Sequence, residues 1–88
     1  MPYWQPTFSG DAEESLDLFF DDCEAVVSAN GLDRFKEEQR EKYDRLECSV
    51  IRHGLRGNAK LAIRSWSLRV LRNPAALKEA LRDRFPYS

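Results

Sequence analysis

Apolar residues recur along most of this 88-residue chain at the three- and four-residue spacing that is typical of α-helices. Asp11 is a favourable N-cap, and Glu13 and Glu14 suit the positive end of a helix dipole. Asn30-Gly31 is a common C-cap signal. The pattern therefore predicts a first helix that starts at Asp11 and ends near Asn30. Its apolar stripe consists of Leu16, Phe19, Phe20, Cys23, Val26 and Val27.

A second helix is expected from about Asp33 to Arg52. Its first part is very polar, and a break near Lys36 would separate a short extra helix. His53-Gly54 marks its end. Its apolar face is predicted to contain Phe35, Tyr43, Leu46 and Val50, with Cys48 and Ile51 beside them.

Two more helices are expected in the last third of the chain. One covers about 58–71 and is apolar on two sides, so it is either central or touches a partner. Its main stripe places Trp66 in the core, and the two stripes are Ala59, Ala62, Ile63, Trp66 and Val70, and Leu61, Leu68 and Leu71. The last helix has Asn73 as its N-cap, Pro74 at its first position and Pro86 as its stop. Its apolar positions are Leu77, Leu81 and Phe85.

Residues 1–10 are not predicted to be helical, because Pro2 and Pro6 lack an amide donor and Gly10 closes the segment. Their aromatic density is unusual for a disordered tail, so we expect an extended arm whose rings dock on the helices. These rings are Tyr3, Trp4 and Phe8. The expected fold is all-α: a compact bundle of four to five helices formed by residues 11–88, preceded by this extended N-terminal arm.

Composition places the chain among ordinary globular domains, with 42% hydrophobic and 33% charged residues. No apolar run approaches the ~20 residues that a membrane span needs. The N-terminus lacks the basic start and apolar run of a secretory signal. Cys23 and Cys48 therefore indicate buried, reduced thiols in an intracellular, cytoplasmic protein, and a disulfide is the minor alternative.

The sequence offers no recognisable catalytic machinery. His53 is the one histidine, and beside Gly54 at a helix end it is expected to interact with the helix C-terminus rather than act as a base. Sequence-adjacent carboxylates such as Asp21-Asp22 lack the opposed geometry of an acid–base pair. Two cysteines and one distant histidine do not make a zinc site. We therefore expect neither an enzyme nor a bound metal or cofactor.

The net charge of −1 hides a division between the two halves of the chain. Residues 1–44 carry four basic and twelve acidic side chains, a net charge near −8, whereas residues 45–88 carry ten basic and three acidic ones, near +7. Such asymmetry either marks interaction surfaces or reflects neutralisation between packed helices. The candidate assembly surface combines acidic positions of the first helix with basic positions further on: Asp17, Asp21, Asp22, Arg52, Arg56, Lys60 and Arg64.

The four basic residues of that set recur every four positions, which would line one helical ridge if the turn at Gly54 permits. A phosphate-binding ridge is one interpretation. The chain has no zinc knuckle and no glycine–aromatic RNA platform, and its pI is about 5.8. We therefore favour a solvated or inter-subunit ridge, and specific nucleic-acid binding is not expected.

Three segments together resemble the capsid N-terminal lobe of gypsy-class LTR-retrotransposon Gag proteins. Residues 6–11, Pro-Thr-Phe-Ser-Gly-Asp, look like the Phe-x-Gly turn before that family's first helix, with its bulky pair at Phe19-Phe20. Residues 55–59, Leu-Arg-Gly-Asn-Ala, resemble its Leu-x-Gly-x-Ala turn, and residues 77–85 its closing Leu-x3-Leu-x3-Phe helix. The family often has tryptophan three residues after the alanine, where this chain has Ala62.

The resemblance implies a structural protein that self-associates, or associates with other Gag lobes, into a capsid-like particle. An alternative from the same resemblance is a domesticated adaptor, similar to Arc, that binds short aromatic-containing peptides in a groove beside the N-terminal arm. The candidate groove residues are then Tyr3, Trp4 and Phe8. Rings that simply cap the core are the simplest interpretation of the arm. An unrelated helical interaction domain is a third possibility.

Overall fold

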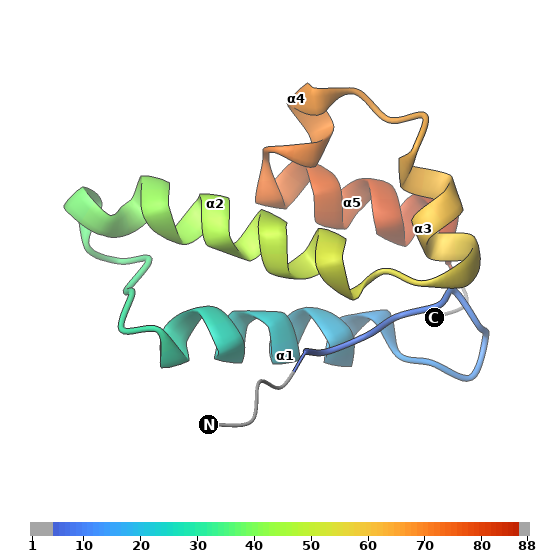
Figure 1. The fold of residues 1–88 in the computed structure, drawn as a ribbon, viewed down its shortest axis with the longest axis horizontal. Helices are drawn as coiled ribbons and strands as arrows, with labels where there is room; N and C mark the ends of the chain where they lie inside the picture. Colours follow the sequence, from blue (N-terminus) through green and yellow to red (C-terminus); the bar gives the residue numbers. More distant parts are fainter. Residues whose placement is uncertain (1–4, 87–88) are drawn as a thin grey trace.

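Five α-helices joined by short connections make up residues 5–86, the part of the chain that the computed structural model describes (Figure 1). They are α1 (Leu16–Ala29), α2 (Glu37–Gly54), α3 (Gly57–Ile63), α4 (Leu68–Leu71) and α5 (Pro74–Arg84). The predicted all-α bundle of four to five helices is therefore confirmed. Among the described residues, no helix is both long and apolar enough to cross a bilayer.

The core lies where α1, α2 and α5 meet. The longest helix, α2, packs against α1 on one side and α5 on another, and α4 packs on α5 (Figure 1). These three helices bury most of the apolar positions that their spacing predicts: Leu16, Phe19, Phe20, Cys23 and Val27 from α1, Tyr43, Cys48, Val50 and Ile51 from α2, and Leu77 and Leu81 from α5.

The first helix starts later than predicted. Ser15, not Asp11, is its N-cap, and the Ser15 hydroxyl accepts a hydrogen bond from the Leu18 amide at 3.2 Å. The Glu14 carboxylate instead accepts hydrogen bonds from the amides of Ser9 (2.9 Å) and Asp11 (3.2 Å), which holds residues 11–14 in a turn. The acidic residues before α1 therefore organise the end of the arm rather than a first helical turn.

The second helix also starts later than Asp33, immediately after the possible break at Lys36. The Asp33 carboxylate accepts from the Phe35 amide at 2.9 Å, and the Asp33 amide donates to Gln39 Oε1 at 2.9 Å. These bonds form a local turn that competes with the helix. The placement of Phe35 on the apolar face is therefore wrong, and its side chain is 80% exposed.

The single helix predicted over 58–71 is wrong, because the chain breaks between Ile63 and Leu68 into α3 and α4. The Ser67 hydroxyl accepts from the Val70 amide at 3.4 Å and thereby restarts the helix as its N-cap. Trp66 consequently lies in a turn and is half-buried against the core rather than at the centre of a helix face.

The last helix agrees with the prediction. Asn73 is its N-cap and accepts from the Ala76 amide at 3.1 Å, and Pro74 occupies the first helical position. Leu77, Leu81 and Phe85 are buried, as their spacing predicts.

The arm docks on the bundle through its main chain as well as its ring. The Phe8 amide donates to the Gly54 carbonyl, and the Phe8 carbonyl accepts from the Arg56 amide, both at 2.9 Å. This places Phe8 beside Leu55 in a single parallel β-bridge. Its ring is fully buried, 5.7 Å from the Phe19 ring and 5.5 Å from the Phe85 ring between centroids. Docking is thus confirmed for Phe8, whereas Tyr3 and Trp4 lie outside the described residues.

Gly54 is required for this close approach. A Cβ at that position would collide with the Pro6 carbonyl oxygen and lie 2.9 Å from Cε1 of Phe19. Gln5 adds a further contact between the arm and α2, because its side-chain Nε2 donates a hydrogen bond to the Val50 carbonyl at 3.1 Å. The glycine that ends α2 therefore serves the arm as well as the helix terminus.

Replacing Phe8 should cost more stability than replacing Trp66, although tryptophan is the larger residue. We expect Phe8→Ala to lower the free energy of unfolding by about 3–5 kcal/mol, the range for a fully buried aromatic side chain. Trp66→Ala should cost less, about 1–2 kcal/mol, because its side chain is only partly buried. Urea unfolding of the two variants measures both values, and an equal or greater loss for Trp66 would contradict the arm as a core element.

Candidate functional site

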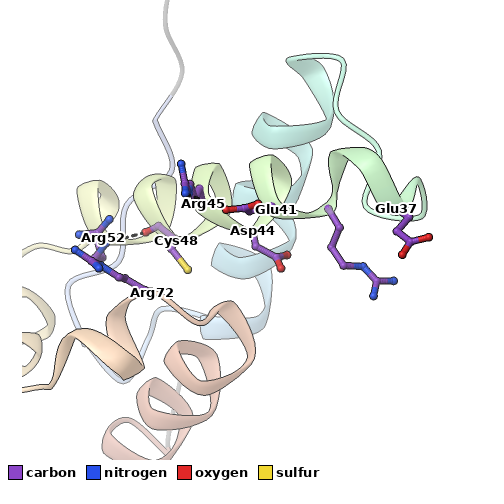
Figure 2. A pocket seen from close by; sticks show the side chains of 8 residues that line it. Glu37, Glu41, Asp44, Arg45, Cys48, Arg52 and Arg72 are labelled. Atoms are coloured by element: carbon purple, nitrogen blue, oxygen red, sulfur yellow. Dashed lines mark hydrogen bonds and ion pairs between the residues drawn. The ribbon is translucent and has the colours of Figure 1, made fainter.

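An open groove of about 830 Å³ runs along α2, and Arg72, at the start of the α4–α5 connection, lines its opposite side (Figure 2). Its floor includes Cys48, and charged side chains form its walls. The residues that line it are Glu37, Arg40, Glu41, Asp44, Arg45, Cys48, Arg52 and Arg72.

Charge is unevenly distributed along this groove. Glu37 lies at one end, whereas Arg52 and Arg72 lie together near Cys48 at the other (Figure 2). Arg52 is partly immobilised, because its Nε donates to the Cys48 carbonyl at 3.3 Å. The groove is therefore a polar surface with an acidic and a basic end, and Arg40 is the one cation in its acidic half.

The basic residues of the candidate assembly surface do not form one ridge. Helix α2 ends at Gly54, and Leu55 and Arg56 are extended, so Arg52 is separated from the three that follow. Lys60 lies within α3, while Arg56 and Arg64 flank that helix as its N-cap and C-cap. The Arg56 guanidinium donates to the carbonyls of His53 and Leu55.

The acidic residues of that surface lie on α1, and one of them already has a partner. Asp17 pairs with Arg82 of α5 at 3.4 Å, through two largely exposed side chains. Asp21 is exposed and Asp22 half-buried. Within residues 5–86, no ion pair joins these acidic positions to Arg52, Arg56, Lys60 or Arg64.

Part of the charge division is nevertheless neutralised inside the fold, by a buried ion network that the sequence analysis missed. Lys78 Nζ of α5 lies 2.8 Å from Oε1 of Glu24 on α1 and 2.7 Å from Oε2 of Glu47 on α2. Glu47 is only 4% exposed. One signal was present in the sequence: Glu47 stands four residues from both Tyr43 and Ile51, which places a carboxylate on the buried face of α2.

The network shifts the pKa of each member. Burial raises the pKa of Glu47, and the nearby Lys78 only partly offsets that effect. Burial also opposes ionisation of Glu24 and Lys78, but their mutual hydrogen bond and charge outweigh it, so the pKa of Glu24 is lowered and that of Lys78 is raised. Lys78 therefore remains charged while it joins three helices.

The two cysteines are buried, free thiols, as predicted. Burial and the nearby carboxylate of Glu47 raise the pKa of Cys23 to about 12 and that of Cys48 to about 11. The reactive thiolate is consequently scarce at neutral pH. Among the residues that the structure describes, no three histidine, cysteine, aspartate or glutamate side chains gather as a metal site.

Comparisons with known proteins assign no family: no protein-family model, curated protein or solved structure matches the chain significantly. The His53 ring contacts Ser49 of its own helix, with Nδ1 2.7 Å from the Ser49 carbonyl and 3.2 Å from its hydroxyl.

The buried network predicts a large difference between two cations of α5. Lys78→Met should lower the free energy of unfolding by about 3 kcal/mol at neutral pH, because it leaves buried Glu47 ionised without a cation. The matched variant Arg82→Met removes an exposed pair and should cost less than about 1 kcal/mol.

The cost of Lys78→Met should also shrink as the pH falls towards about 4, near the ordinary pKa of a glutamate. The raised pKa of Glu47 means that this carboxyl is protonated early in acid, and a neutral carboxyl no longer requires the lost cation. Denaturant unfolding at both pH values tests this. A cost that is independent of pH would indicate that Lys78 acts through packing of its stem instead.

Proposed function

We propose that this chain is a non-catalytic structural module that self-associates, in the manner of the retrotransposon Gag capsid N-lobe that its sequence resembles. Its partners are then other copies of itself or other Gag-type lobes in a capsid-like particle. The proposal assigns no cofactor to the domain.

The main support is that the three segments that carry the resemblance pack together at one point. Phe8 of the first segment bridges Leu55 of the second, and its ring meets the edge of Phe85 of the third. Gly10 leaves room for that ring, since a Cβ there would lie 2.7 Å from Cε1 of Phe85. Helix caps and apolar spacing alone would not require these three segments to be neighbours in the fold. Their contact is what one shared turn architecture would produce.

Charge supplies the contact through which copies could associate. The basic residues around α3 are exposed and have no carboxylate partner among residues 5–86, whereas α1 presents acidic side chains. Contact between the α1 face of one copy and the α3 region of the next is heterologous, so it can propagate into rings or shells. Exposed charge pairs contribute at most ~1 kcal/mol each, so the isolated domain should associate weakly.

Sedimentation at high protein concentration tests this proposal. We expect a monomer near 10.3 kDa when the protein is dilute and oligomers when it is concentrated in low salt. High salt should dissociate these oligomers, because it screens exposed charges. The double variant Arg56→Glu plus Lys60→Glu should form no oligomer larger than a dimer under the same conditions.

A matched control separates the position of the charges from their number. Lys36→Glu plus Lys42→Glu makes the same change in net charge at two exposed residues at the start of α2. This control should associate like the unmodified protein. Concentrated protein that stays monomeric in low salt would contradict the assembly proposal.

One observation favours the alternative, a domesticated adaptor for aromatic peptides. The bundle already holds an extended aromatic segment, its own arm, through main-chain hydrogen bonds to residues 54 and 56. If that position accepts peptides in trans, a protein that lacks residues 1–8 and keeps its helical circular dichroism spectrum should bind an aromatic peptide more tightly, because the arm no longer competes. Calorimetric titration with a synthetic peptide of residues 1–10 measures this. Equal or absent binding by both proteins would remove the adaptor.

A further inference from the structure

We propose that the groove on α2 is the seam of a two-fold symmetric dimer, in which the α2 helices of two copies lie antiparallel. This inference rests on the proposed self-assembly and deepens it, because it identifies a second contact surface with a different symmetry. The occupant of the groove is then the same helix of another copy.

The first argument is the order of charges along the groove. Glu37 and Glu41 lie in the N-terminal half of α2, and Arg45 and Arg52 in the C-terminal half, with Arg72 adding a cation from the opposite wall. These positions of α2 recur at three- to four-residue spacing through Cys48, so they share one face of the helix. The face is therefore acidic on balance in its first half, where Arg40 is the one cation among Glu37, Glu41 and Asp44, and basic in its second half (Figure 2).

The second argument is that these charges are poorly compensated within one molecule. Glu41 and Arg45 pair at 2.9 Å, but both side chains are about 80% exposed. Within residues 5–86, Glu37, Arg52 and Arg72 take part in no ion pair. Glu37 and Arg52 are separated by ~22 Å along the helix, more than a Debye length of ~10 Å, so solvent screens their attraction.

Antiparallel pairing places opposite charges together at both ends. With the two-fold axis near Asp44 and Arg45, Glu37 faces Arg52 of the partner subunit, and Glu41 faces the partner subunit's Arg72. Symmetry repeats each contact, as in any isologous interface. A parallel arrangement would instead bring acidic ends together and basic ends together, which is repulsive.

The lining residues favour a weak partner of matching charge over an apolar ligand. Apart from Cys48 they are all charged. The same distribution also suits the dipole of α2, with acidic residues in its first turn and basic ones in its last. An experiment must therefore separate contact between copies from stabilisation of the helix.

Exchanging the charges of Glu37 and Arg52 distinguishes contact between copies from stabilisation of the helix. Glu37→Arg and Arg52→Glu should each weaken dimerisation in low salt by at least about tenfold, because each reversal creates two repulsive contacts. The combined variant should dimerise again, although its helix dipole is opposed at both ends. An equimolar mixture of the two single variants should form a heterodimer, since both of its contacts are attractive. Analytical ultracentrifugation measures all four samples.

Two controls reverse an exposed charge near a helix end without touching the groove. Glu38→Arg reverses an exposed charge in the same first turn, and Arg69→Glu reverses an exposed charge in the last turn of α4. Both should dimerise like the unmodified chain, and circular dichroism confirms that every variant folds. Failure of the combined variant and of the mixture to dimerise would overturn the seam.

These measurements also distinguish the α2 seam from the head-to-tail contact between the α1 face of one copy and the α3 region of the next. Oligomers that respond to reversal at Arg56 and Lys60 but not at Glu37 and Arg52 would leave self-assembly intact and reject this dimer. If the unmodified protein forms only a dimer, and reversal at Arg56 and Lys60 does not change it, the seam is supported and the head-to-tail contact is rejected.

Discussion

The whole structure depends on one side chain that belongs to no helix, because Phe8 fills the space between α1, the end of α2 and α5. Its ring touches Phe19 and Phe85, and its main chain bonds to the residues on either side of Leu55. The next residue of the arm continues the tie, since the Ser9 carbonyl accepts from the Ala59 amide of α3 at 3.3 Å. The arm is thus a structural part of the bundle, and it helps to set where α3 begins.

Electrostatics has two separate tasks in this domain. Inside, Lys78 joins three helices through carboxylates whose burial leaves little alternative to pairing. Outside, the groove face of α2 is acidic on balance in its first half and basic in its second, and the charges around α3 are basic. The acidic and basic halves of the sequence therefore neutralise each other only in part. The surface charges that stay unpaired are acidic in one region and basic in another. This separation gives two identical subunits complementary surfaces for a contact.

Sequence patterns predicted the elements whose packing follows from one periodic stripe. Both α1 and α5 have such stripes, and the caps of α5 were recognisable because Asn73-Pro74 has a single favourable interpretation. Predictions failed where short polar side chains compete with the helix for main-chain groups, as at Asp33 and Ser67. The Lys78 network required knowledge of which helices become neighbours. The groove could not be predicted from the sequence either, because Arg72 lines it from a separate element.

The position of Phe8 also has a consequence for the order in which the chain folds. Its binding site is completed by Phe85, which lies almost the whole length of the chain away. Such contacts of high sequence separation form slowly, because a long loop must close before they contribute. During synthesis the arm precedes α5, so its binding site is complete only after α5 has emerged. Until then α1 and α2 expose the apolar surface that the arm later covers, so the nascent chain is the state most exposed to misassociation.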